Sequence, residues 1–231
     1  MTLIRSRPHG KGILGRNKTG PVLYLGDTQK SASVWSDMSG RGNHGIVYGA
    51  GTPPPATPQA LGYLFDGVDD YVDAGNGASL RDTLLGITVE AWIYPTNYTG
   101  HTSNQWVIVS KFTYPTLGWW FHLRNGGDVN FNTLDGAVHY TVTSVTIPLN
   151  QWSHVVGWSN GITNKIYING IERASAASGT LTASNANLRI AATTTDYIFQ
   201  GTIDEVRIFN RALSATEIKR LYDRTKILFG V

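Results

Sequence analysis

The fold is decided by residues 117–170, which read LGWWFHLRNGGDVNFNTLDGAVHYTVTSVTIPLNQWSHVVGWSNGITNKIYING. Short runs rich in β-branched and aromatic residues are typical of strands. A turn pair separates many of these runs, and Asn or Asp followed by Gly tolerates the positive φ that tight hairpins need. The pairs are Asn125-Gly126, Asp135-Gly136, Asn160-Gly161 and Asn169-Gly170. The stretch therefore predicts an antiparallel meander.

Alternation inside one run predicts which side chains face the core. In residues 119–124 the apolar positions share one face of the expected strand: Trp119, Phe121 and Leu123. The other face carries a polar-aromatic set: Trp120, His122 and Arg124. We expect the first set to be buried and the second to lie on the outer side of a sheet.

The rest of the chain extends this pattern in both directions. Residues 22–27 and most runs after residue 61 are strand candidates, whereas the proline-rich residues 52–58 predict a surface loop. One helix is expected in residues 213–224, where Ser214 and Glu217 form a capping box and Leu213 and Ile218 a hydrophobic staple. No βαβ rhythm occurs, so the fold class is all-β: a two-sheet antiparallel jelly-roll sandwich closed by a short C-terminal helix.

An N-terminal extended arm, residues 1–20, precedes the sandwich of residues 21–231. The arm has no acid and carries five of the 19 basic residues: Arg5, Arg7, Lys11, Arg16 and Lys18. We expect it to anchor the protein to other structural proteins or to copies of itself; the alternative is a solvated tail. Nucleic acid is not the partner we expect, because the rest of the chain is slightly acidic.

The composition excludes several classes of protein. The chain has no cysteine, so disulfides, thiol nucleophiles and thiolate metal sites are excluded. No run approaches the roughly 18 apolar residues of a membrane span, and the first 20 residues lack the apolar core of a signal peptide. We expect the protein at a virion surface or outside the cell, exported by another route or within an assembly.

Six motifs occur in an order that closely resembles one family: FDGVDDYVDAG at 65–75, ITVEAWIYP at 87–95, IVSKF at 108–112, QWSHVVGW at 151–158, KIYINGIE at 165–172 and GTIDEVRIFNRALSATEIKRLY at 201–222. The chain resembles the laminin-G-like, concanavalin A-like lectin jelly-roll family over about residues 22–222. The resemblance implies a mostly non-catalytic module that binds glycans, proteins or other surface ligands. It also implies that His154 is a core residue.

The resemblance further implies a structural calcium ion. Family members bring the segments that correspond to FDG and IDEV close together near the N-terminal loop. The expected ligands are Asp66, Asp204 and the backbone around Asn43. The alternative is that Asp66 forms a turn and Asp204 caps backbone donors.

The outer side of residues 119–124 is the expected ligand site. A sugar ring has an apolar face that stacks on aromatic rings, and polar neighbours bind its hydroxyls. Trp120, His122 and Arg124 would form this strip, with three loop residues as neighbours: Tyr98, His101 and Tyr114. The alternative is that Trp120 lies under a loop or at a subunit contact.

Catalysis is disfavoured by the acidic residues. The chain has only four glutamates, Glu90, Glu172, Glu205 and Glu217, and none belongs to the paired arrangement on one strand that glycosidases of this fold carry. Three functions remain, in decreasing order of support. They are a non-enzymatic lectin-like module displayed on a larger assembly such as a virion, a stand-alone secreted or cell-surface carbohydrate-binding lectin, and a glycoside hydrolase.

Overall fold

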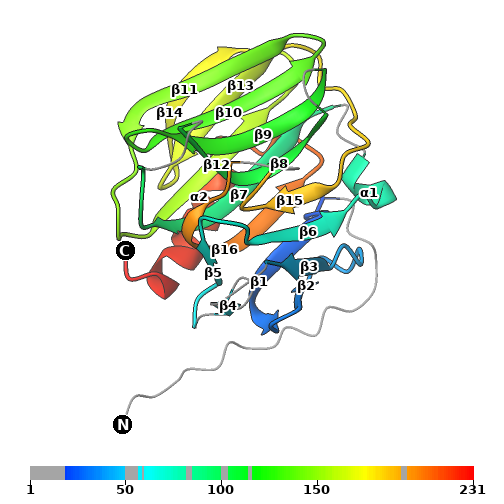
Figure 1. Cartoon of the computed structure of the whole chain (residues 1–231). Coiled ribbons are helices and arrows are strands. Elements are labelled where there is room, and N and C mark those ends of the chain that lie inside the picture. Colours follow the sequence, from blue (N-terminus) through cyan, green and yellow to red (C-terminus); the bar gives the residue numbers. More distant parts are fainter. Residues whose placement is uncertain are drawn as a thin grey trace.

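Two layers of antiparallel strands form the molecule (Figure 1). The computed structural model describes residues 19–49, 57–58, 60–81, 85–99, 104–113, 116–193 and 197–231. The basic residues of the arm lie outside this part of the chain. All the paired strands in the described residues are antiparallel. Most of them form one continuous hydrogen-bonded series whose two end strands, β11 and β14, lie beside each other, so that the sheet almost closes.

The front layer holds seven neighbouring strands. In hydrogen-bonded order they are β11 (Val138–Thr146), β10 (Asp128–Asp135), β9 (Leu117–Arg124), β8 (Gln105–Thr113), β15 (Leu188–Ile190), β6 (Tyr71–Gly75) and β3 (Gly45–Tyr48). The back layer holds β1 (Leu23–Lys30), β16 (Gln200–Phe209), β7 (Ile87–Pro95), β12 (Ser153–Ser159), β13 (Thr163–Ile168) and β14 (Ile171–Ala177). Strand β2 (Val34–Asp37) joins the layers, because it pairs with both β3 and β1.

The turn pairs predict the hairpins correctly. Each of the four Asn/Asp-Gly pairs falls between consecutive antiparallel strands: β9–β10, β10–β11, β12–β13 and β13–β14. At the last turn both Asn169 and Gly170 have positive φ, 53° and 75°. This backbone matches the twist of the flanking strands, which is why the local signal is decisive here.

The core lies between the two layers. Its largest fully buried side chains include Phe121 and Phe131 of the front layer and Trp35 of the linking strand. The layers approach closely at Gly157 of β12, where an added Cβ would overlap the ring of Phe131 on β10. Glycine is required at this position because the opposing ring fills the space that a side chain would occupy.

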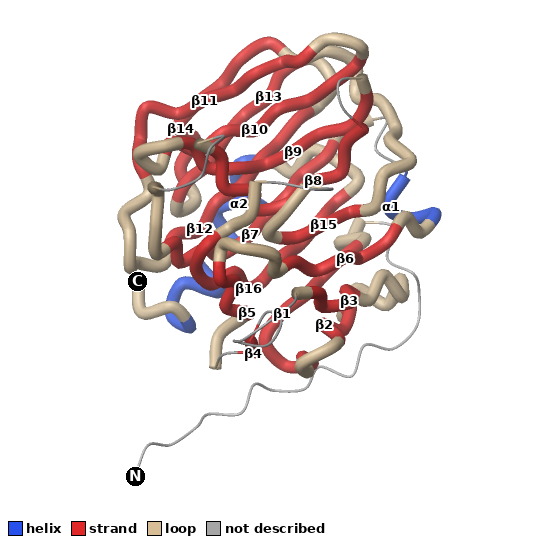
Figure 2. Tube along the Cα trace, viewed as in Figure 1, coloured by secondary structure: helices blue, strands red, loops and turns tan. Residues whose placement is uncertain are grey.

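Helix α2 (Ala215–Thr225) and the short helix η1 (Lys226–Leu228) cover the outer face of the back layer (Figure 2). The capping box of Ser214 and Glu217 is present, as predicted. Leu213 and Ile218 pack together with Val156, Tyr167 and Phe209 in a second apolar cluster. The prediction of a C-terminal helix packed on the sandwich is therefore confirmed.

Strand β5 (Tyr63–Asp66), one of the predicted strands, pairs with β16. Two short elements were not expected from the sequence. The two-residue β4 (Thr57–Pro58) pairs with β5 inside the segment predicted as a loop. A one-turn helix, α1 (Ala78–Arg81), follows β6. None of the helices in the described residues has the length and apolar character that a membrane span requires.

Candidate functional site

Strand β9 places its side chains as alternation predicts. Trp119, Phe121 and Leu123 point into the core between the layers. Trp120 and His122 lie on the other side of the strand and belong to neither apolar cluster. Arg124 follows them at the exposed end of the strand.

Pairing with neighbouring strands extends this set. Trp120 lies opposite Asn132 of β10, and Asn132 lies opposite Tyr140 of β11. We call Trp120, His122, Arg124, Asn132 and Tyr140 the outer strip. Sequence reasoning missed Asn132 and Tyr140. Their pairing could have been predicted by counting outward along both strands from the Asp135-Gly136 turn.

The outer strip contains polar atoms that are buried without a partner. Asn132 is 0% exposed, and neither its amide nitrogen nor its amide oxygen has a hydrogen bond. Nδ1 of His122 is buried and unbonded as well. A buried polar group left unpaired costs roughly 1–3 kcal/mol, and native proteins contain few of them. Unpaired buried atoms also occur on the back layer, at Glu90 Oε2 and His154 Nδ1, so the front-layer set is one of several such places in the described residues.

Burial and the nearby charge of Arg124 keep His122 neutral, because together they lower its pKa to about 3. A neutral imidazole offers one donor and one acceptor. The indole of Trp120 stacks on this ring, with centroids 5.8 Å apart and an interplanar angle of 16°. Trp120 and neutral His122 therefore form a stacked aromatic pair beside the amide of Asn132, with the charged Arg124 at the end of the strip.

Access to the strip differs along its length. Trp120 is only 7% exposed and His122 2%, so the two residues do not form the open platform expected from the sequence. Tyr140 is 62% exposed, and its ring meets Trp120 edge-on with centroids 6.5 Å apart. Tyr140 is therefore an exposed member of the strip, whereas Trp120 and His122 are covered.

Of the three predicted neighbours of the strip, the structure describes only Tyr98. Tyr98 is buried in the core between the layers, where its hydroxyl donates to the carbonyl of Ile147 at 3.0 Å. Burial raises the pKa of Tyr98, as expected for a hydroxyl shielded from water. Tyr98 therefore has a structural position, which corrects the prediction. His101 and Tyr114 lie outside the described residues.

The predicted calcium ligands are not brought together. Asp66 lies opposite Gln200 of β16, four residues from Asp204, which corresponds to about 13 Å along a strand. The side chain of Asn43 donates to the carbonyl of Val22. Val22 in turn pairs with Ile208, which lies four residues beyond Asp204 along β16. Asp66 accepts hydrogen bonds from the amides of a turn, and Asp204 accepts one from the amide of Glu205. The expected three-residue site is therefore wrong as a set.

A different acidic group forms around Asp66. Carboxylate oxygens of Asp66, Asp69 and Asp70 lie within 4.8 Å of one another at the β5–β6 turn. Calcium prefers several carboxylate and carbonyl oxygens in flexible geometry, and this group offers three carboxylates. These residues fit the ion better than the predicted set does.

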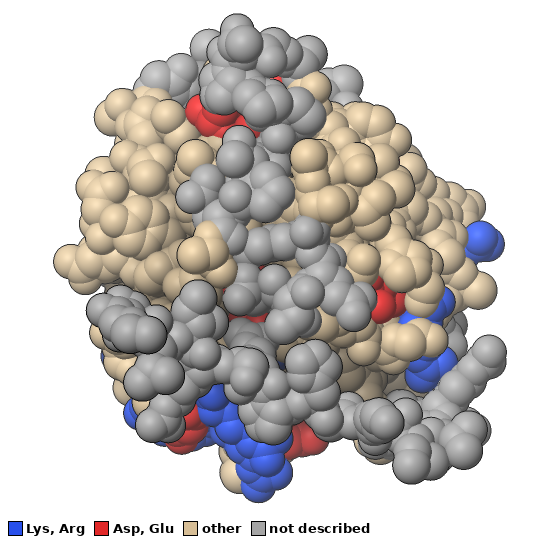
Figure 3. Space-filling view, turned by 90° about the horizontal axis from the view of Figure 1, so that it is seen from below, with Lys and Arg blue, Asp and Glu red and all other residues tan. Residues whose placement is uncertain are grey.

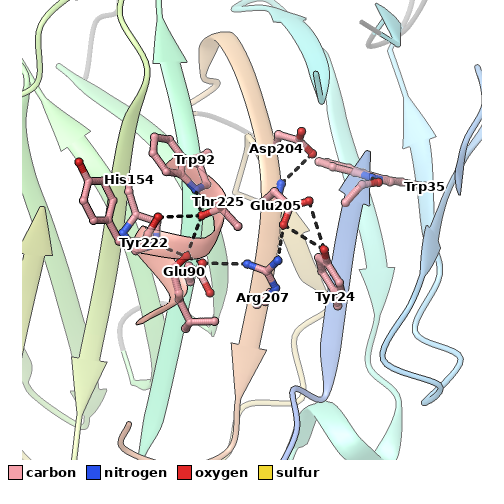
Figure 4. A network of polar contacts seen from close by, with 12 residues as sticks. Tyr24, Trp35, Glu90, Trp92, His154, Asp204, Glu205, Arg207, Tyr222 and Thr225 are labelled. Atoms are coloured by element: carbon pink, nitrogen blue, oxygen red, sulfur yellow. Dashed lines mark hydrogen bonds and ion pairs between the residues drawn. The ribbon is translucent and has the colours of Figure 1, made fainter. Parts of the chain in front are cut away.

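A polar network on the back layer is the counterpart of the outer strip (Figure 4). Arg207 of β16 forms ion pairs with Glu90 of β7 and with Glu205 of its own strand. Glu90 also bonds His154 at 3.0 Å, and Glu205 accepts from the hydroxyl of Tyr24. Despite its burial, Glu90 has a lowered pKa, since Arg207 and His154 stabilise its charged form. The network pairs the charge of Arg207 with two carboxylates, but Oε2 of Glu90 and Nδ1 of His154 are buried without a hydrogen bond.

Acid should destabilise the fold through His122. The unfolded histidine takes up a proton near pH 6.5, whereas the folded one stays neutral until about pH 3. The stability that His122 contributes is thus complete above pH 6.5 and is lost as the pH falls toward 3. We expect the free energy of unfolding, measured in urea at pH 7 and pH 4.5, to fall less in His122→Phe than in the unmodified protein. Equal falls would show that His122 is not held neutral.

Solved structures of other proteins have a similar fold. Domain 4 of AbnA, a GH43 extracellular arabinanase from Geobacillus stearothermophilus in complex with arabinotriose, has 21% identity and a TM-score of 0.68; the match covers 88% of this chain and 98% of that domain. The botulinum neurotoxin serotype G binding domain has 17% identity and a TM-score of 0.68, with 89% of this chain and 51% of the toxin chain covered. The binding domain of Paraclostridial Mosquitocidal Protein 1 has 17% identity and a TM-score of 0.65, with 90% and 52% covered.

The chain thus spans about half the length of the toxin binding domains, and these identities support the fold alone. A comparison with curated proteins gives no match. One family does match, over residues 66–219, or two thirds of the chain. Together with the two-layer antiparallel fold, this match shows that the chain belongs to the concanavalin A-like lectin/glucanases superfamily.

Proposed function

We propose that this protein is a non-enzymatic carbohydrate-binding module that holds a sugar on the outer strip. The observation that carries the proposal is the side chain of Asn132, whose amide is buried without any hydrogen bond between Trp120 and Tyr140. An amide offers both donors and acceptors, which is what the adjacent hydroxyls of a sugar ring require.

The other members of the strip suit the same ligand. The exposed ring of Tyr140 offers an apolar plane for the C–H face of a sugar, and its hydroxyl is a polar handle. Neutral His122 adds a donor and an acceptor without demanding a charged ligand. The arabinanase domain described above, in complex with arabinotriose, and the toxin binding domains support a binding role by analogy.

The glutamates support the non-enzymatic part of the proposal. Glu90 and Glu205 both bind Arg207 on the back layer. Glu172 accepts from Lys165 and Tyr167, and Glu217 caps helix α2. A glycosidase needs two carboxylates that face one sugar, and the glutamates are all engaged within the protein.

Opposite effects on stability and binding should identify Asn132 as a ligand contact. In Asn132→Leu the unpaired buried groups disappear, so the free protein should keep or gain thermal stability. Its affinity should fall about ten- to hundredfold, because two hydrogen bonds to the sugar are lost. The measurement is calorimetric titration with arabinotriose, xylotriose, cellotriose, chitotriose and lactose, beside a thermal melt.

Two further variants make this test independent of folding. Tyr140→Ala removes an exposed ring and should weaken binding without unfolding the protein. Ile162→Ala removes an equally accessible apolar side chain on the β12–β13 hairpin and should leave binding unchanged. The proposal fails if the unmodified protein binds none of the five sugars, or if Asn132→Leu binds as tightly as it does.

The place of the module on a larger assembly, such as a virion, is a second part of the proposal; the alternative is a secreted or cell-surface lectin. The assembly hypothesis is supported by residues 1–20, which carry five basic residues and no acidic one. Figure 3 shows Lys and Arg side chains of the described residues next to Asp and Glu side chains on this side of the molecule.

Deleting residues 1–18 tests the anchoring role of the arm. The truncated protein should keep its thermal stability and its sugar affinity but should fail to join its native particle in a reconstitution assay. Normal incorporation of the truncated protein would contradict this role and favour the secreted lectin.

A calcium ion at Asp66, Asp69 and Asp70 is the third part of the proposal. Because the cluster offers three carboxylates to one cation, millimolar calcium bound to the folded protein should raise the melting temperature of the unmodified protein. Asp69→Asn should lose this increase, and Asp128→Asn, an acid outside the cluster, should keep it. The same increase in both variants would exclude the β5–β6 turn as the site.

A further inference from the structure

A second aromatic group lies on the same outer face of the front layer, away from the outer strip. Tyr48 of β3 stacks on Tyr71 of β6, with ring centroids 4.9 Å apart and an interplanar angle of 12°. Tyr48 is 44% exposed, and Ile46 beside it on the same face is similarly accessible. A stacked pair at the surface presents one ring plane to the solvent.

The pair is held in place from behind by Arg189 of β15. The guanidinium carbon lies 4.8 Å from the centre of the Tyr71 ring. Nε of Arg189 contacts Asp73 at 3.4 Å, and Nη1 donates to the carbonyl of Thr193 at 2.9 Å. Three contacts fix the guanidinium, and Asp73 neutralises its charge. We call Tyr48, Tyr71 and Arg189 the tyrosine platform.

Strand register places this platform and the outer strip on one face. A single row of paired residues crosses the front layer: Ile46, Asp73, Arg189, Ser110, Trp120, Asn132 and Tyr140. Tyr48 and Tyr71 stand two residues from Ile46 and Asp73, and therefore on the same side. The exposed rings of the two groups, Tyr140 on β11 and Tyr48 on β3, are six strand steps apart, or roughly 29 Å.

The two groups are separate contact surfaces. Between them the hydroxyl of Ser110 donates to the carbonyl of Ala192 at 2.7 Å, so the segment at Ala192 lies over the middle of the row. Arg189 likewise donates to Thr193. The middle of the row is thus bonded within the protein, while both ends carry exposed tyrosine rings, Tyr140 and Tyr48.

We propose that the tyrosine platform is a second sugar-contact site, so that each chain holds two sugar units on one face. The proposal rests on the carbohydrate-binding function argued above. The platform offers an exposed ring plane, and in the described part of the structure the hydroxyls of Tyr48 and Tyr71 make no hydrogen bond. Its one cation is already paired with Asp73, which favours a neutral sugar over an acidic one.

Two sites on one rigid face change what the protein binds best. A ligand that reaches both sites gains from the high effective concentration of the second contact, by a factor of about a hundred or more. The preferred target is therefore a polysaccharide or a dense glycan surface, and a single short sugar is held weakly.

Stoichiometry and avidity together test this inference. Of the five sugars named above (the panel), the one of highest affinity is used. Calorimetric titration with it should give two bound sugars per chain for the unmodified protein. Tyr48→Ala and Tyr140→Ala should each leave one. On a surface densely coated with the same sugar, each variant should bind at least tenfold more weakly than the unmodified protein. Ile162→Ala is the control in both assays.

The outcomes separate this inference from the proposed function. One bound sugar that is lost in Tyr140→Ala and kept in Tyr48→Ala would overturn the second site and leave the outer strip intact. Binding of no panel sugar would overturn both proposals. Self-association of the unmodified protein that disappears in Tyr48→Ala, seen by sedimentation velocity, would assign the platform to a second copy of the chain and overturn it as a sugar site.

Discussion

The ion pairs of Arg207 with Glu90 and Glu205 are the interaction on which the rest of the structure depends. Hydrogen bonds continue the network to Tyr24 and His154, so that it ties together β1, β16, β7 and β12. Charges buried in this way are tolerated only when they are fully paired and shielded from water. Helix α2 and the C-terminal segment provide the shield: Trp92 bonds Thr225 at 2.9 Å and stacks on Phe229 at 4.2 Å.

This arrangement leaves one sheet face for a ligand. The inner faces of both layers form the core, and α2 occupies the outer face of the back layer. The outer face of the front layer is exposed at Tyr140 and at Tyr48, whereas Trp120, His122 and Asn132 between them are buried. The two outer faces differ in charge: the back face carries the ion pairs of Arg207 with Glu90 and Glu205, whereas the front face carries the neutral side chains Asn132 and His122. Both faces keep buried atoms without a hydrogen bond, Glu90 Oε2 at the back and the Asn132 amide at the front, and the front set adjoins the exposed ring of Tyr140.

The parts of the fold that could be predicted from the sequence rest on local signals. Asn169-Gly170 is a turn because of its own backbone preferences, and Ser214 caps α2 because of a residue three positions on. Alternation correctly placed Trp120 and His122 on one side of β9. It could not predict their burial, since burial depends on segments that are distant in the sequence.

The calcium ligands and Tyr98 show the same limit. Whether Asp66 meets Asp204 depends on the register of β5 against β16, and no local pattern contains that register. Tyr98 is a tyrosine in a loop, a residue type that is common in binding sites, yet its hydroxyl donates a hydrogen bond to the carbonyl of Ile147. Asn132 is different, because its pairing with Tyr140 follows from counting outward along both strands from the Asp135-Gly136 turn, which is a local signal.

The central claim, that a sugar supplies the missing partners of Asn132, is tested most directly by NMR. The side-chain amide signals of Asn132 and the indole signal of Trp120 are followed while the best-bound panel sugar is added. The account predicts that both shift in a saturable way with one dissociation constant. Shifts confined to the β5–β6 turn or to helix α2, with the Asn132 amide unchanged at saturation, would contradict it.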